Sequence, residues 1–104
     1  MTQRIEMFVL DKIDYETARS DRHAVDLPID ARFACADILG NKICVWIYMG
    51  TCEATCARTF VAYATGEEVA YRASYLATVH DKTRGKGAVA TVHLFEQDGL
   101  LSRL

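Results

Sequence analysis

Residues 32–49 read RFACADILGNKICVWIYM, and they carry the clearest structural signal in the chain. Two runs rich in β-branched and aromatic residues flank the pair Gly40-Asn41, which is typical of the two-residue turn of a tight β-hairpin. The pattern predicts two antiparallel strands, Arg32 to Leu39 and Lys42 to Met49, joined directly by that turn.

The position of the turn sets the register of this hairpin. With Gly40 and Asn41 as its central residues, Ile38 lies opposite Ile43, Asp37 opposite Cys44 and Cys35 opposite Trp46. Because side chains alternate between the two faces of a strand, one face is expected to be a core face: Ala34, Ala36, Ile38, Ile43, Val45, Ile47 and Met49. The other face mixes polar and aromatic side chains: Phe33, Cys35, Asp37, Cys44, Trp46 and Tyr48.

Similar short runs, separated by turn residues, recur along the rest of the chain. They predict strands at Arg4 to Leu10, His23 to Leu27 (ended by Pro28), Ala57 to Ala64, Ser74 to Val79 and Ala88 to Phe95. The polar segment Asp11 to Arg22 is expected to contain at most one short helix, at Asp14 to Arg19. Residues 1–104 are therefore predicted to form a single all-β domain, an antiparallel β-sandwich or a small, partly open barrel of about seven strands.

Composition and charge exclude several protein classes. The chain is 51% hydrophobic and 25% charged, which is ordinary for a globular domain and argues against disorder. No apolar run approaches the ~20 residues of a transmembrane helix, and no signal peptide is recognisable at the N-terminus. We therefore expect a protein without membrane association that stays in the cytoplasm. The formal net charge of −2 gives no global attraction to nucleic acid.

The four cysteines are Cys35, Cys44, Cys52 and Cys56. In a reducing cytoplasm free thiols are the default expectation. Cys52 and Cys56 have the spacing of structural zinc ligands, and Cys35 and Cys44 would complete a set of four. However, there is no second closely spaced pair, so we expect no metal and no other cofactor. A Cys52–Cys56 or Cys35–Cys44 disulfide is the remaining alternative.

No catalytic motif is present in the sequence. It contains no G-x-S-x-G elbow, no H-E-x-x-H, no Walker loop and no G-x-G-x-x-G. None of His23, His80 and His93 has a spacing that implies contact with a cysteine nucleophile. The prediction is that the chain is not an enzyme.

The aromatic face of the central hairpin is the first candidate for binding. If Phe33, Trp46 and Tyr48 are exposed, they suit base stacking or a protein hot spot, where Trp and Tyr are enriched. If they are covered, they form a second core layer of a sandwich. Homodimerisation that covers this face would be compatible with both possibilities.

The loop from His80 to Gly87 is the second candidate, because it is the most basic stretch of the chain. Lys82, Arg84 and Lys86 can hold a phosphate group of a nucleotide or nucleic acid. The alternative is a hairpin tip that is charged only because it is solvated.

Landmarks along the chain, taken in order, resemble a family of short phage-encoded proteins whose function is not established. They are Leu27-Pro28-x-x-Ala31, Cys44-x-Trp46, Arg58-Thr59-Phe60 followed by Thr65-Gly66, Tyr75-Leu76-Ala77-Thr78-Val79 and His93-Leu94-Phe95-Glu96. They span about residues 23 to 96, and the chain departs from the family at Asp11 to Arg22 and at Thr51 to Cys56. The resemblance implies a viral accessory protein in the cytoplasm of a bacterial host, and it supplies no catalytic residues.

These observations predict a non-catalytic phage accessory protein that binds a host macromolecule, most simply a host protein, stoichiometrically. Inhibition of a host defence is the role that such small viral domains suggest by analogy. The expected contacts are the aromatic anchors Phe33, Trp46 and Tyr48, with Lys82, Arg84 and Lys86 as electrostatic contacts. One alternative is a protein that sequesters a nucleotide between the basic loop and the aromatic face. The other is a structural phage protein that assembles into an oligomer.

Overall fold

The elements of the described chain are strands. The structure, a computed structural model, describes residues 4–13, 22–69, 72–81, 90–97 and 102–103. The strands are β1 (Ile5–Val9), β2 (Arg22–Pro28), β3 (Arg32–Leu39), β4 (Lys42–Tyr48), β5 (Thr55–Ala64), β6 (Ser74–Asp81), β7 (Ala90–Glu96) and the two-residue β8 (Ser102–Arg103). The short helix predicted at Asp14 to Arg19 lies outside the described residues. Of the described residues, none belongs to a helix with the length and apolar character needed to span a membrane.

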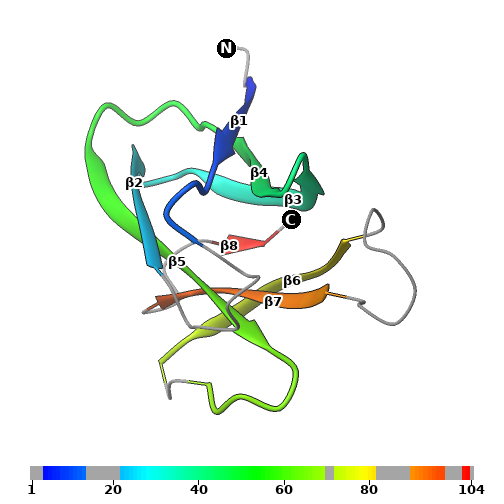
Figure 1. Cartoon of the computed structure of the whole chain (residues 1–104). Coiled ribbons are helices and arrows are strands. Elements are labelled where there is room, and N and C mark those ends of the chain that lie inside the picture. Colours follow the sequence, from blue (N-terminus) through cyan, green and yellow to red (C-terminus); the bar gives the residue numbers. More distant parts are fainter. Residues whose placement is uncertain (1–3, 14–21, 70–71, 82–89, 98–101, 104) are drawn as a thin grey trace.

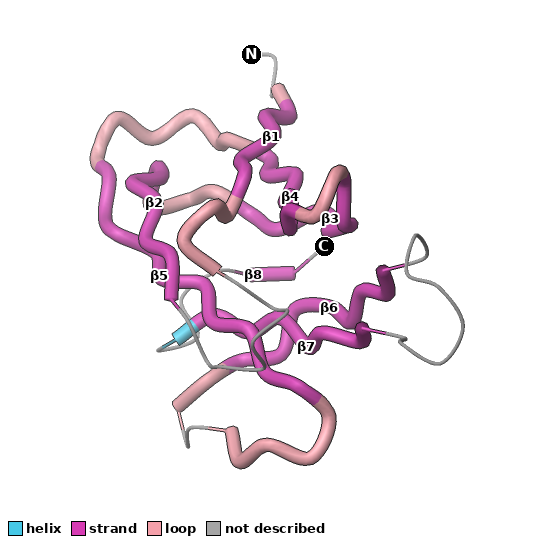
Figure 2. Tube along the Cα trace, in the orientation of Figure 1, coloured by secondary structure: helices cyan, strands magenta, loops and turns pink. Residues whose placement is uncertain are grey.

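The strands form two sheets that pack face to face, as Figures 1 and 2 show. Sheet A has the order β1-β4-β3-β8, and sheet B has the order β2-β5-β7-β6. All pairings are antiparallel except the short parallel contact between β3 and β8. The prediction of an antiparallel β-sandwich with seven main strands is confirmed, and the sheets do not close into a barrel.

The β3–β4 hairpin has the predicted turn. Gly40 has a φ of 55° and Asn41 a φ of 69°, so both central residues lie in the left-handed region that a type I′ turn requires. Next to the turn, Ile38 pairs with Ile43, and Cys35 pairs with Trp46 further along the strands. The register predicted from the turn is therefore correct over this part of the hairpin.

A β-bulge at Ala34 changes the register at the far end of β3. Beyond the bulge, Phe33 lies opposite Ile47, although uninterrupted alternation places Ala34 there. The extra residue inverts the alternation of side chains, so Phe33 turns into the core with 3% of its surface exposed. Arg32 takes the outward position instead. The prediction that Phe33 shares a face with Trp46 is wrong, and Ala34 is only half-buried rather than part of the core.

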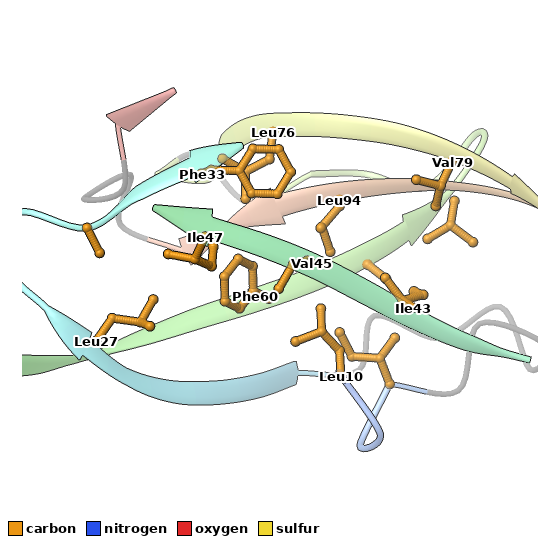
Figure 3. Close-up of a cluster of buried hydrophobic side chains, with 14 residues drawn as sticks. Leu10, Leu27, Phe33, Ile43, Val45, Ile47, Phe60, Leu76, Val79 and Leu94 are labelled. Atoms are coloured by element: carbon orange, nitrogen blue, oxygen red, sulfur yellow. The ribbon is translucent and has the colours of Figure 1, made fainter. Parts of the chain in front are cut away.

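The hydrophobic core lies between the two sheets (Figure 3). Sheet A contributes the inward row of β4 and Phe33 of β3, and sheet B contributes Leu27 of β2 and the inward rows of β5, β6 and β7. The buried cluster consists of Leu10, Ile13, Leu27, Ala31, Phe33, Ile43, Val45, Ile47, Phe60, Ala62, Leu76, Val79, Val92 and Leu94. Full burial of each large aliphatic or aromatic side chain stabilises the fold by about 1.5–3 kcal/mol. One core of this kind serves both sheets.

Candidate protein-binding face

The face of sheet A that points away from sheet B is the candidate site, and we call it the outer face of sheet A. The register of β1 with β4 and of β4 with β3 divides it into three rungs. The rungs are Ile5–Tyr48–Arg32, Met7–Trp46–Cys35 and Val9–Cys44–Asp37, and a further outward pair of the hairpin, Leu39–Lys42, lies beyond the last. Trp46 and Tyr48 share this face, as the hairpin register predicted.

The edge strand β1 exposes a continuous row of large apolar side chains. Ile5, Met7 and Val9 are 49%, 47% and 40% exposed, respectively. Trp46 and Tyr48, on the neighbouring strand, are half-buried. Apolar side chains that adjoin on a surface mark interaction sites, whereas scattered ones are ordinary. Trp, Tyr and Met are also enriched in the cores of protein interfaces.

Ile5, Met7 and Val9 were not predicted from the sequence as binding residues. On the inward side of β1, Phe8 packs against the core and Glu6 forms an ion pair with Arg4. A strand with one solvent-exposed face normally alternates apolar and polar residues. β1 departs from this rule, because its three outward residues are apolar. This departure from alternation is the feature of the sequence that could have identified the exposed row. A strand that is buried on both faces has the same pattern, however.

Charged residues of β3 flank the middle rung of this face, and the exposed Lys42 of β4 lies beyond Asp37, next to the turn. Arg32 lies in the rung of Tyr48, and Asp37 lies in the rung of Cys44. Both are exposed. Within the described part of the chain neither makes an ion pair, although Asp37 Oδ1 accepts a hydrogen bond from the Ile38 N–H at 2.8 Å.

The two cysteines of the outer face differ in environment. Cys44 is buried, and burial raises the pKa of its thiol, with a further contribution from the negative charge of Asp37. It therefore stays protonated at neutral pH and behaves as a small apolar side chain. Cys35 is exposed in the middle rung, beside Trp46.

Cys52 and Cys56 are half-buried and are not joined in the disulfide considered from the sequence. All four cysteines are free thiols. Within the described residues, no group of three or more His, Cys, Asp or Glu side chains is placed to hold a metal ion. Cys56 Sγ instead accepts a hydrogen bond from Arg58 Nε at 3.0 Å.

An open hollow of about 280 Å³ adjoins Cys52. It is lined by Arg4, Pro28, Met49, Gly50, Thr51 and Cys52. The carboxylate of Asp30 accepts hydrogen bonds from the backbone N–H groups of Thr51 at 2.9 Å and Cys52 at 3.1 Å. These bonds, that of Thr51 above all, lower the pKa of Asp30 from its ordinary value. Because the loop amides already bind this carboxylate, they are not available to an external anion.

The outward face of sheet B carries a polar network centred on His93. Its Nε2 lies 2.8 Å from Thr65 Oγ1 and its Nδ1 lies 2.9 Å from Thr78 Oγ1. Thr78 Oγ1 in turn lies 2.8 Å from the hydroxyl of Tyr75. A catalytic histidine is usually oriented by a carboxylate, and among the described contacts of this ring both partners are hydroxyls. The network ties β6, β7 and the turn that follows β5 together.

The other predicted contacts, Lys82, Arg84 and Lys86, lie outside the described residues. Phe33 is in the core and is not available as an anchor. Of the predicted contacts that the structure describes, Trp46 and Tyr48 therefore remain on an accessible face.

A family model described as a domain of unknown function (DUF7352) matches residues 12–101. The matched segment includes β2 to β7, and β1 precedes it. Searches of the curated proteins and of the solved structures found no match.

Proposed function

The chain belongs to this family of domains of unknown function, and we propose that it is a non-catalytic binding protein that associates with protein through the outer face of sheet A. The observation that carries the proposal is the exposed row Ile5, Met7 and Val9 beside Trp46 and Tyr48. Apolar surface contributes roughly 25 cal/mol for each Å² removed from water. Covering this face with another protein surface is therefore favourable.

The resemblance to short phage proteins supports a more specific proposal. On it, the domain is a viral accessory protein that acts in the cytoplasm of a bacterial host. It holds a host protein stoichiometrically and thereby inhibits a host defence. Trp46 and Tyr48 act as anchors, because rigid aromatic side chains supply much contact area at a low cost in conformational entropy.

Affinity capture from a host lysate tests this function. Three baits are compared: the wild-type chain, the double variant Met7→Ser/Trp46→Ser, and Val69→Ser as a matched control. Val69 is an exposed apolar residue (42%) in the loop after β5, away from the outer face of sheet A. Circular dichroism first establishes that all three baits are folded.

We expect the wild-type chain and the Val69→Ser control to recover the same host protein in a stoichiometric complex, and the double variant to lose it. Equal recovery by all three baits would contradict the role of the face. Recovery of no stoichiometric partner by the wild-type chain would contradict the function itself.

A further inference from the structure

We infer that the outer face of sheet A is covered by a second copy of this chain, in a two-fold symmetric dimer with the two faces packed together. This inference rests on the proposed function only in taking the face to be a protein interface. It specifies the occupant, which the exposed apolar row by itself does not.

Opposite charges lie on the two sides of the middle rung, Met7–Trp46–Cys35. Arg32 lies one rung to one side of it, and Asp37 lies one rung to the other side. Both charges are on β3, and both are exposed. The three rungs therefore have a cation and an anion at equivalent positions on either side of the middle rung, and the exposed Lys42 of β4 lies one pair beyond Asp37.

A two-fold interface brings each residue of the patch against the residue related to it by the axis. One possible axis lies in the plane of the interface and runs along the middle rung, perpendicular to the strands. Rotation about this axis places each strand over its own copy, with the two copies antiparallel. Arg32 of each protomer then faces Asp37 of the other, so two complementary ion pairs form. With the axis along the strands instead, β3 would lie over β1, where Ile5 and Val9 offer no opposite charge. The charges thus select the first arrangement.

The apolar residues agree with the same operation. Met7 lies over its copy, Trp46 lies over its copy, and Ile5 lies over Val9, so apolar groups meet apolar groups throughout. Sheets that pack face to face are about 10 Å apart and are rotated by about 30°. Large side chains fill that space.

An unrelated protein would not require this symmetry. Its surface could carry charges complementary to Arg32 and Asp37 at any two positions, whatever the distance between them. Only a second copy requires that the cation and the anion of one face be related through its centre. The pattern of charge therefore points to a second copy as the occupant of this face in the free protein, which a host protein that binds the same face must displace.

Charge exchange on the purified full-length chain tests the arrangement. The Kd of self-association is measured by sedimentation velocity over a concentration series for the wild type, Arg32→Asp, Asp37→Arg and the combined variant. Each single variant creates two like-charge pairs, and we expect it to weaken the dimer at least about tenfold. The combined variant exchanges the charges and is expected to recover a Kd within about threefold of the wild type.

Two results would overturn the inference. One is a wild-type chain that stays monomeric over the whole series. The other is a combined variant that associates no better than the single variants.

Cys35 supplies an independent distance test, because it lies on the proposed axis and is exposed. A short bismaleimide should join two chains of the wild type and of Cys52→Ser, but not of Cys35→Ser. A dimer that is cross-linked equally well without Cys35 would contradict this packing.

The outcome for this inference is separable from that for the proposed function. A monomeric chain that captures a host protein through the same face would overturn the inference and leave the function standing. A dimer that responds to the charge exchange as expected but captures no host protein would support the inference and contradict the proposed function.

Discussion

At the scale of single residues, Phe33 contributes to stability rather than to binding. It is 3% exposed and packs in the core between the sheets. Phe33→Ala is expected to lower the free energy of unfolding by about 3–5 kcal/mol, through lost burial and the cavity that remains. Met7→Ala, at a 47% exposed position of sheet A, should cost under about 1 kcal/mol in the monomer. Urea denaturation at a concentration too low for self-association measures both, and equal losses would place Phe33 outside the core.

The side chains of Arg58 and Glu96 form an ion pair inside the protein. They are 2% and 0% exposed, with Arg58 Nη1 3.6 Å from Glu96 Oε2. Arg58 Nη2 also donates a hydrogen bond to the Ile29 carbonyl at 2.7 Å. Arg58 therefore links β5 both to β7 and to the segment that follows β2.

Removal of one member of this pair leaves the other charge buried. Arg58→Met is expected to destabilise the fold by about 3–5 kcal/mol, whereas Arg58→Met/Glu96→Leu should recover part of that loss. A double-mutant cycle in denaturant measures the coupling. Additive effects of the two substitutions would show that the pair is not coupled in the folded protein.

Asp30 gives the stability a component that depends on pH. Hydrogen bonds from Thr51 and Cys52 lower the pKa of its carboxyl group in the folded state. The contribution is fully present above the unfolded pKa of about 4 and is lost as the pH falls through the lower folded value.

Asp30→Asn is therefore expected to lower the urea midpoint at pH 7, and its deficit relative to the wild type should shrink on acidification toward pH 2. Urea midpoints at a series of pH values measure this. A deficit that does not change with pH would show that the ionised carboxylate is not what matters at this position.

At the scale of elements, two glycines with left-handed backbone make different demands. Gly40 in the β3–β4 turn has a φ of 55°, and the space that a Cβ would occupy there is open, so its substitution meets only backbone strain. Gly50, which follows β4, has a φ of 66°, and a Cβ there would overlap the Asp30 carboxylate. The second substitution thus also disturbs the loop that Asp30 binds.

Gly40→Ala is expected to cost about 1–2 kcal/mol, the usual penalty for a left-handed alanine. Gly50→Ala should cost clearly more, because the Asp30 hydrogen bonds to Thr51 and Cys52 must also change. Denaturation midpoints of the two variants compare them directly. A smaller loss for Gly50→Ala would mean that the carboxylate moves aside without penalty.

The strands themselves were largely predictable, and the bulge in β3 was not. Alternation and turn residues are local properties, so Arg32–Leu39 was placed with the bounds that the structure has. A bulge arises where the pairing of two strands and the filling of the core conflict. Nothing between Arg32 and Cys35 shows that conflict, since Phe33 and Ala34 are both acceptable on either face of a strand.

At the scale of the whole molecule, self-association links stability to concentration. If folding and dimerisation are coupled, mass action raises the Tm as the protein concentration rises. We expect this for the wild-type chain over about a hundredfold range of concentration, and no such rise for Met7→Ser/Trp46→Ser. Thermal unfolding followed by circular dichroism measures it. A wild-type Tm that is independent of concentration would indicate that the folded unit is the single chain.

By itself the sequence determined the strands, the Gly40-Asn41 turn and the all-β class, because each depends on the conformational preferences of neighbouring residues. The tertiary structure alone decided which faces are covered. Phe33 entered the core through the pairing of β3 with β4, and Ile5, Met7 and Val9 stayed exposed because they lie on the face of sheet A that points away from sheet B. An apolar side chain has the same sequence signature whether it is buried or exposed, since its burial depends on strands that are distant in the chain.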